Sequence, residues 1–390
     1  MVIVVVSDDS NSEFFRCSKR ANQEVTSNRC RLKSASPQDL PLLFANFGRM
    51  RPFNVAIIGY GFAGRCFHSY LIGLTPGLKL HGIASRDPQT RERIVRDRGC
   101  IAYEGLEDVL KDDAVDLVVL ASPSAVHCEQ AVAALDAGKS VVTDKIMCLN
   151  LAECDKMVAA AERNKKLLTV FQNRRWDGDY LTVKHLMQSG ELGTVRWMEL
   201  AWQGFGAWGG WRGAAQMGGG RFFDLGAHLV DQLLTLQNSP PESVYCRLRR
   251  DYDGSDIDSE ALIVINFANR ATGIADLSGM SAISKPRFRI HGSRATFVKY
   301  GLDPQEKAMI TGDIDSAVEP MENYGLLHDG KSERQIATLP GRWRTFYENV
   351  AEHLTRNAPI AVPLSESRAG MQVIDAALKS AATGEVVHLS

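Results

Sequence analysis

Short apolar runs alternate with amphipathic segments through the first half of the chain, from residue 54 onward. Residues 55–58 are apolar without alternation, as expected of a parallel strand that is buried on both faces. Further strands are expected at residues 78–85, 116–120, 140–143 and 167–171, and helices lie between them, with Asn150 as the N-cap of a helix at 151–164. This pattern predicts a doubly wound parallel sheet with helices on both faces.

The second half of the chain has a different pattern. Longer strands are expected in succession without intervening helices, at residues 195–202, 243–248, 260–267, 272–277 and 288–291. Helices are expected at residues 180–188, 222–236, 343–355 and 366–380, and residues 302–340 are expected to form an irregular surface excursion. The predicted fold is therefore α/β: a Rossmann doubly wound parallel sheet in residues 50–172, and a C-terminal α+β domain with a large, mostly antiparallel open sheet in residues 173–390.

Residues 1–49 differ from the rest, because they are rich in Ser, Asn and charged residues and show no sustained periodicity. The apolar run at residues 2–6 is too short for the core of a signal peptide and has no basic region before it. Met50 stands four residues before the first expected strand. We therefore expect residues 1–49 to be a disordered extension or the product of a start site assigned too early.

Composition excludes several classes of partner. The chain has 390 residues, 45% hydrophobic and 23% charged, with a net charge of −1. This balance gives no reason to expect nucleic acid or a membrane surface as a partner, and no apolar run approaches the roughly 20 residues that span a bilayer. The eight cysteines show no C-x-x-C pair, so we expect reduced thiols and a cytoplasmic protein.

A glycine-rich turn directly follows the first strand. Gly59, Gly61 and Gly64 form a G-x-G-x-x-G pattern, and a helical segment begins at once. In such a turn the first glycine permits the bend, the second lets the backbone approach a pyrophosphate, and the third allows close helix packing. Because a strand precedes the turn and a helix follows it, the pattern predicts a dinucleotide site.

The end of the second strand indicates which dinucleotide binds. Selection of NAD places an acid there to hold the ribose 2′-hydroxyl, but residues 75–86 contain no acid. Ser85 and Arg86 stand at this position and could receive a 2′-phosphate, Arg86 by its charge and its planar donors. We therefore expect NADP in preference to NAD, the alternative being a solvated arginine on a loop.

Side chains suited to alcohol oxidation occur at Lys145, Asp224 and His228. Lys145 lies just past a strand end and could steady a developing alkoxide, although a surface lysine is the plainer interpretation. Asp224, His228 and Asp231 are spaced to share one face of a helix. An imidazole that titrates near neutrality suits acid–base work, but an N-terminal acid beside a core histidine is the alternative. No H-E-x-x-H motif accompanies them, so no metal is expected.

Aromatic residues precede that helix among several glycines: Trp202, Phe205, Trp208 and Trp211. Their flat faces suit the C–H face of a sugar or cyclitol, or they serve as core or subunit-interface anchors.

From Asn54 to its end, the chain resembles the Gfo/Idh/MocA family of NAD(P)-dependent sugar and cyclitol oxidoreductases. The resemblance rests on the glycine loop at 59–64, on Asp144-Lys145 at the family's acid-lysine-proline motif, and on the signature at 219–231. The stretches 171–177, 291–293 and 299–305 resemble the NADP-dependent scyllo-inositol dehydrogenase branch. Ile146 replaces the family's proline, so the backbone that aims Lys145 is expected to differ.

The resemblance implies an active site between the two domains and a small-molecule substrate, a polyol or sugar. It also implies a homodimer or homotetramer formed through the C-terminal sheet. The expected catalytic residues are Lys145, Asp224 and His228. The expected cofactor-binding residues are Gly59, Gly61, Phe62, Ala63, Gly64, Ser85, Arg86, Ser122, Pro123, His127 and Lys145. The expected substrate-binding residues are Lys145, Asn173, Arg174, Trp211, Asp224 and His228.

The sequence therefore predicts a dehydrogenase that transfers a hydride between NADP and a secondary hydroxyl of a cyclitol or sugar. The alternative is a non-catalytic, ligand-sensing co-regulator built on the same fold.

Overall fold

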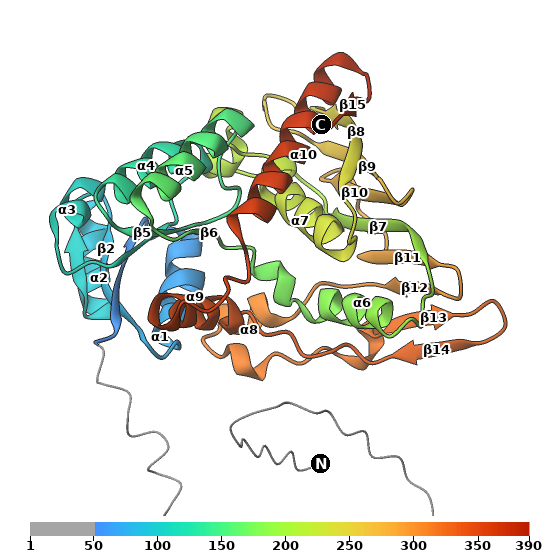
Figure 1. Ribbon diagram of the computed structural model, residues 1–390, viewed down its shortest axis with the longest axis horizontal. Helices are drawn as coiled ribbons and strands as arrows, with labels where there is room; N and C mark the ends of the chain where they lie inside the picture. The colour runs from blue at the N-terminus through green and yellow to red at the C-terminus, as the bar shows by residue number, and fades with distance from the viewer. Residues whose placement is uncertain (1–50, 390) are drawn as a thin grey trace, which may run out of the picture. The chain divides into compact units, whose positions relative to one another are not determined.

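The computed structural model describes residues 51–389, and the expectation for residues 1–49 lies outside that range. Figure 1 shows two sheets and their helices, with β1 in blue and the last helix, α10, in red. No helix among residues 51–389 is both long enough and apolar enough to span a membrane.

The first sheet has six parallel strands in the order β3-β2-β1-β4-β5-β6. Its strands are β1 (Phe53–Ile58), β2 (Leu78–Ala84), β3 (Ile101–Tyr103), β4 (Leu117–Leu120), β5 (Ser140–Thr143) and β6 (Leu168–Val170). The last four residues of β1 and all of β4 and β5 are buried, because helices cover both faces. This strand order is that of a Rossmann fold.

Helices connect these strands in sequence: α1 (Ser69–Gly73), α2 (Pro88–Arg98), α3 (Leu106–Lys111), α4 (His127–Asp136) and α5 (Leu151–Asn164). A π-helix, Ala63–His68, precedes α1, so the segment after the glycine turn is wound more widely than an α-helix. Asn150 caps α5 by accepting a hydrogen bond from the backbone N–H of Glu153 at 2.9 Å, as its position in the sequence predicts.

The second sheet has nine strands in the order β14-β13-β12-β11-β7-β10-β9-β8-β15. They are β7 (Val195–Gln203), β8 (Pro241–Arg249), β9 (Glu260–Phe267), β10 (Thr272–Ser278), β11 (Phe288–Gly292), β12 (Thr296–Lys299), β13 (Gly325–His328), β14 (Glu333–Ile336) and β15 (Val387–His388). Every neighbouring pair is antiparallel except β7 and β10. The predicted fold class is confirmed, whereas the domain boundaries at 50, 172 and 390 stay predictions.

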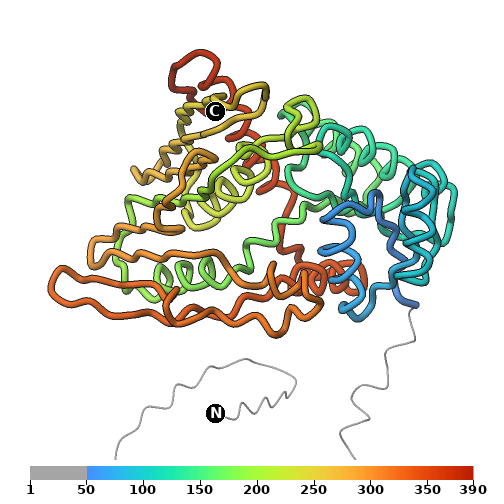
Figure 2. Tube along the Cα trace, turned by 180° about the vertical axis from the view of Figure 1, so that it is seen from behind, coloured from blue at the N-terminus to red at the C-terminus, as the bar shows by residue number. Residues whose placement is uncertain are grey.

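The helices of this half are α6 (Gly178–Gln188), α7 (Ala227–Leu236), α8 (Gln305–Ile310), α9 (Arg344–Arg356) and α10 (Leu364–Thr383). The π-helix Phe222–Gly226 runs into α7. Short 3-10 turns are Ser124–Val126, Asn173–Trp176, Gly210–Gly213, Ala215–Met217, Ile314–Ser316 and Met321–Asn323. Figures 1 and 2 show α10 running between the sheets, and it contacts α5 and β6 as well as α7 and β8. It therefore ties the two halves together.

The glycine turn gives a test of the fold and of the nucleotide site together. A Cβ on Gly64 would lie 2.1 Å from the carbonyl oxygen of Gly59, whereas a Cβ on Gly61 would meet nothing within 4 Å. We predict that Gly64→Ala destabilises the protein, by about 1–3 kcal/mol or more, because backbone must move. Gly61→Ala is expected to keep the melting temperature but to weaken NADP binding, because its methyl group occupies the approach of a pyrophosphate.

Thermal melts and NADP titrations of both variants check this prediction. An unchanged melting temperature in Gly64→Ala would contradict the packing argument. Unchanged NADP affinity in Gly61→Ala would contradict the placement of the pyrophosphate.

Candidate active site

The carboxyl ends of the parallel strands bring the predicted residues of the first domain to one edge of the sheet. The glycine turn follows β1, Ser85 and Arg86 follow β2, Ser122 and Pro123 follow β4, and Lys145 follows β5. Ligands of open α/β sheets bind at this edge. The second domain lies against the same edge and supplies the other side of the site.

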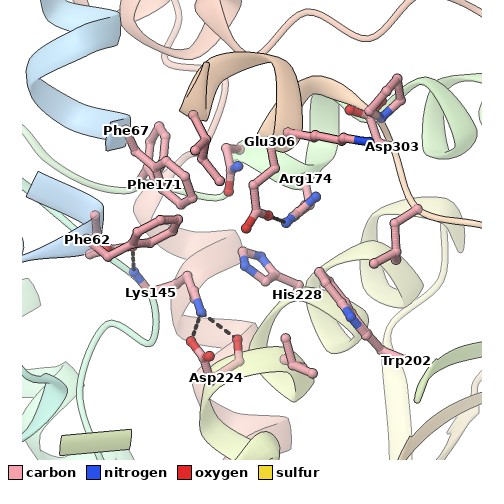
Figure 3. Close-up of a pocket in the computed structure, with 18 of the residues that line it drawn as sticks. Phe62, Phe67, Lys145, Phe171, Arg174, Trp202, Asp224, His228, Asp303 and Glu306 are labelled. Carbon is pink, nitrogen blue, oxygen red and sulfur yellow. Dashed lines mark hydrogen bonds and ion pairs between the residues drawn. The ribbon is translucent and has the colours of Figure 1, made fainter. Parts of the chain in front are cut away.

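A cavity of about 1030 Å³ lies between this edge and the second domain. Seven residues that the sequence predicted for the site line it: Phe62, Ala63, Lys145, Asn173, Arg174, Asp224 and His228. Figure 3 shows Lys145, Asp224 and His228 converging on one region of it. The structure therefore brings together residues that are up to 166 positions apart, from Phe62 to His228.

Asp224 holds the Lys145 ammonium group in place. Lys145 Nζ donates to the Asp224 carbonyl oxygen at 2.6 Å and also to its carboxylate oxygen Oδ1. The other carboxylate oxygen accepts a hydrogen bond from Arg212 Nε at 3.1 Å. Burial would raise the pKa of the Asp224 carboxyl, but the charges of Lys145 and Arg212 outweigh it and lower that pKa. Two of the three protons of the Lys145 ammonium group thus donate to Asp224, and the third is left to donate to a ligand.

His228 lies on α7 and is 4% exposed. Burial first, and then the positive charges of Lys145, Arg174 and Arg287, hold the pKa of His228 well below its usual range. Its Nδ1 lies 3.3 Å from Oε1 of Gln172. Because an amide oxygen only accepts, this contact puts the proton on Nδ1 and leaves Nε2 with a free electron pair. The ring is therefore neutral at pH 7 and suited to act as a base.

The helix that carries these residues differs from the expectation in one respect. Asp231 was expected on the same face as Asp224 and His228, but its carboxylate accepts two hydrogen bonds from Arg175, at 2.8 and 2.7 Å, away from the cavity. Asp224 lies in the π-helix Phe222–Gly226, whereas His228 and Asp231 both lie on the α-helix α7. Asp231 does not line the cavity with Asp224 and His228, and its carboxylate binds Arg175.

Trp211 does not line the cavity in this structure, and its expected contact with substrate stays a prediction. It lies on the 3-10 turn Gly210–Gly213, where the guanidinium group of the next residue, Arg212, stacks 4.5 Å from its ring centroid. That turn presents Arg212 to the cavity instead. Trp202 and Trp208, from the same aromatic cluster, do line it.

His127 is fully buried, and the direct cofactor contact expected for it stays a prediction. Its Nδ1 lies 2.9 Å from the carbonyl oxygen of Ile146, and its Nε2 lies 2.9 Å from that of Ser122. Both ring nitrogens are therefore engaged by backbone next to β4 and β5. His127 thus joins the two loops.

The backbone after Lys145 is unusual because the peptide bond between Lys145 and Ile146 is cis. Lys145 N–H also donates to Asp144 Oδ1 at 2.8 Å. Burial would raise the pKa of Asp144, but His68 and then Lys145 lower it to about 2. The carboxylate beside Lys145 is thus ionised at neutral pH.

The glycine turn fits a dinucleotide. The open space beside Gly61 would admit a pyrophosphate, and Gly64 lies where no side chain fits. Arg86 is exposed at the end of β2, and the guanidinium of Arg91 holds the carbonyl oxygens of Ser85 and Arg86 at 2.9 and 3.0 Å. Arg91 therefore fixes the backbone at the end of β2, where the sequence predicts the adenosine ribose to bind.

Sequence reasoning missed three residues of the site: Gln172, Arg212 and Glu306. Gln172 follows β6, and Arg212 follows Trp211 in the aromatic cluster, so a strand end and a glycine-rich aromatic loop were available as signals. Glu306 lies in the stretch expected to be a surface excursion, which instead carries α8, β13 and β14. No local pattern pointed to it.

A dinucleotide turn beside a clustered ammonium, imidazole and carboxylate defines the class of nicotinamide-dependent oxidoreductases. Comparisons with known proteins agree. Residues 53–172 match the oxidoreductase family with an NAD-binding Rossmann fold, and residues 180–298 match the Gfo/Idh/MocA C-terminal domain. The chain belongs to the Gfo/Idh/MocA family of oxidoreductases.

Three relatives illustrate the similarity. YdgJ of Escherichia coli, an uncharacterized oxidoreductase, is 32% identical over 339 residues, which cover 84% of this chain and 96% of YdgJ. IolW of Bacillus subtilis, a scyllo-inositol 2-dehydrogenase (NADP(+)), is 29% identical over 347 residues, 86% of this chain and 95% of its own. A crystal structure from Klebsiella pneumoniae, described as an oxidoreductase, has a TM-score of 0.78 and 34% identity, and covers 87% of this chain and 96% of its own.

The contact between His228 and Gln172 predicts a pH effect. Gln172→Glu places a carboxylate against Nδ1, which favours the protonated imidazole. Deprotonated His228 is the form that can accept a proton, so the acid limb of the pH–rate profile for substrate oxidation is expected to move up by about 1–3 pH units. Gln172→Leu is the control, because it removes the acceptor without adding charge, and it should lower kcat without that upward shift.

The measurements are kcat and kcat/KM, between pH 5 and 10, for a substrate that the unmodified protein oxidises. An acid limb that stays in place in Gln172→Glu would contradict the assignment.

Proposed function

We propose that the protein is an NADP-dependent dehydrogenase that oxidises a secondary hydroxyl of a cyclitol or sugar. The observation that carries this proposal is the convergence of a bound ammonium, Lys145, and a neutral imidazole, His228, in one cavity beside a dinucleotide turn. Oxidation of a secondary alcohol removes a proton from the hydroxyl oxygen and a hydride from the carbon that bears it. It therefore needs a base and a positive charge that stabilises the developing alkoxide.

In oxidation, His228 takes the hydroxyl proton at Nε2, while Gln172 keeps the other ring nitrogen protonated. Lys145 directs its remaining N–H at the alkoxide oxygen, and Asp224 keeps the ammonium group in that orientation. A bound nicotinamide dinucleotide supplies the hydride acceptor. Trp202 lies nearly parallel to the His228 ring, with centroids 6.2 Å apart, and limits the rotation of the imidazole.

The choice of a cyclitol or sugar is supported by two observations. IolW, the relative that is 29% identical, is an NADP-dependent scyllo-inositol 2-dehydrogenase. The cavity also combines aromatic rings with many charged and hydrogen-bonding groups, among them Trp202, Trp208, Asn173 and Glu306. Flat rings suit the C–H faces of a polyol ring, and polar groups suit its hydroxyls.

The choice of NADP is supported by the end of β2, where Ser85 and exposed Arg86 replace an acid. Phe62 and Ala63, which line the cavity at the start of the helix, would adjoin the nicotinamide half.

The second sheet supports a homo-oligomer. Three apolar side chains on its strands are 38–41% exposed: Trp197, Leu262 and Leu326. The helices α6, α7 and α10 pack on other parts of this domain and leave these side chains exposed. A second copy covering this face would remove those side chains from water. Sedimentation that yields only a monomer at micromolar concentration would contradict this part of the proposal.

Cofactor choice can be measured directly. Because a charge-assisted phosphate contact is lost, Arg86→Ala is expected to narrow the preference for NADP over NAD by about ten- to a hundredfold. Arg96→Ala, which removes an exposed arginine paired with Asp97 on α2, is the control and should leave the preference unchanged. The preference is measured as the ratio of the dissociation constants for NADP and NAD, obtained by calorimetry. Equal affinity of the unmodified protein for the two nucleotides would refute the proposal that NADP is preferred.

The activity itself is tested with a panel of cyclitols and aldoses, each with NADP and with NAD. We expect oxidation of at least one cyclitol or sugar with NADP. His228→Ala should lower turnover about 10²–10⁴-fold and spare NADP binding. His185→Ala, which removes an exposed imidazole on α6, should change neither. Tight NADP binding without turnover of any polyol would instead favour a ligand-sensing co-regulator.

A further inference from the structure

One wall of the cavity comes from a segment far from the catalytic group in sequence. Residues 302–323, here called the wall segment, include α8 and the turns after it, and Glu306, Lys307 and Ile310 from α8 line the cavity. The segment also reaches the first domain, where the Tyr70 hydroxyl donates to Gly312 O at 3.0 Å and accepts from Ile314 N–H at 3.1 Å. It therefore closes the side of the cavity that faces the nucleotide-binding helix.

Glu306 projects from the wall segment toward His228, across the cavity from Asp224 (Figure 3). Its carboxylate oxygen Oε2 accepts a hydrogen bond from Arg174 Nη2. Its side chain is 36% exposed, and within residues 51–389 its other oxygen, Oε1, has no hydrogen-bond partner. One oxygen is thus anchored, and the other is free to accept a hydrogen bond from a ligand.

The guanidinium group of Arg174, which binds Glu306, is itself held in place. It lies between two indole rings, 4.8 Å from the centroid of Trp202 and 4.7 Å from that of Trp343. Asp177 accepts a hydrogen bond from the Trp343 indole N–H at 2.7 Å and lies 3.5 Å from Arg174 Nη1. Burial opposes the charge of Arg174, but Asp177 and Glu306 outweigh it and raise the pKa of Arg174. The cation that orients Glu306 therefore stays charged and has little freedom to move.

The other carboxylates that line the cavity are already committed to protein donors. Asp224 binds Lys145 and Arg212, and Asp144 binds the backbone N–H of Lys145 and lies 3.5 Å from His68 Nε2. Asp303 accepts from the backbone N–H groups of Gly178 and Gln305, at 2.7 and 2.9 Å. Glu306 thus differs from Asp224 and Asp303, both of whose oxygens accept hydrogen bonds from the protein. It also differs from Asp144, because its side chain is 36% exposed whereas that of Asp144 is 14% exposed and lies against His68.

We propose that Glu306 is a specificity-determining residue, which accepts a hydrogen bond from a substrate hydroxyl remote from the carbon that is oxidised. This proposal rests on the proposed function and adds the substrate class, which is an uncharged polyol. A carboxylate that is held in place accepts strongly from a hydroxyl. It also repels a carboxylate or phosphate on the substrate at that end. The wall segment therefore selects the substrate, while Lys145 and His228 perform the proton chemistry.

The test compares Glu306→Gln with the unmodified protein, and uses scyllo-inositol as the neutral probe and glucuronate as the anionic probe. For scyllo-inositol, KM is expected to rise about ten- to a hundredfold with kcat changed less than threefold, because a charged acceptor is lost. For glucuronate, KM is expected to stay unchanged or fall, because a repulsive charge is removed. Glu306→Asp keeps the charge, but its side chain is one methylene shorter and moves the carboxylate away from the substrate hydroxyl. This variant should raise KM for scyllo-inositol without lowering KM for glucuronate.

Glu322→Gln is the matched control, because Glu322 is an exposed acid of the wall segment that does not line the cavity. Calorimetry gives the affinity for NADPH, and for scyllo-inositol in the presence of NADPH, so that binding is measured apart from turnover. NADPH affinity and melting temperature should match the unmodified protein in every variant.

An unchanged KM for scyllo-inositol in Glu306→Gln would overturn the proposal. So would an equal loss for both probes, since a disturbed fold rather than a lost contact would cause it. If the unmodified protein oxidises and binds no polyol, the proposed function itself fails. Turnover by the unmodified protein with no effect of Glu306→Gln rejects the role of Glu306 alone.

Discussion

The ion pair between Lys145 and Asp224 is the interaction on which the site depends. It joins the end of β5 in the first domain to the π-helix before α7 in the second, across 79 positions of sequence. The two side chains are only 13% and 11% exposed, and side chains so far removed from water keep their opposite charges only when each has a partner, since burial of a lone ion is costly. The pair therefore keeps the two halves of the site in register, and Arg212 satisfies the second oxygen of the carboxylate.

That pair also sets the electrostatics of its surroundings. With the negative charge of Asp224 shared between two cations, His228 meets net positive charge in a buried place and remains neutral. Gln172 fixes which ring nitrogen of His228 carries the proton, because its amide oxygen accepts a hydrogen bond from Nδ1. A base, a hydrogen-bond donor and a nucleotide turn thus meet at the carboxyl edge of a parallel sheet, where the topology leaves room for ligands.

The sequence predicted those parts of the fold and site that local patterns encode. Short stretches of chain contain the glycine turn, the strand ends and the spacing of Asp224 and His228. Their roles could therefore be predicted from local sequence patterns. The helical spacing of Asp231 did not show that Arg175, 56 positions away, binds its carboxylate. Gln172 and Glu306 were missed because their partners lie 56 and 132 positions away, and such contacts arise only from the packing of the two domains.

Transfer of a labelled hydride is the most direct measurement of the chemistry assigned to this site. scyllo-Inositol deuterated at its ring carbons, or another deuterated polyol that the protein oxidises, is incubated with NADP, and the reduced nucleotide is analysed by mass spectrometry and NMR. Direct transfer predicts one deuterium at C4 of the nicotinamide in every NADPH molecule formed. NADPH that carries only protium, or no NADPH from any polyol, would contradict it.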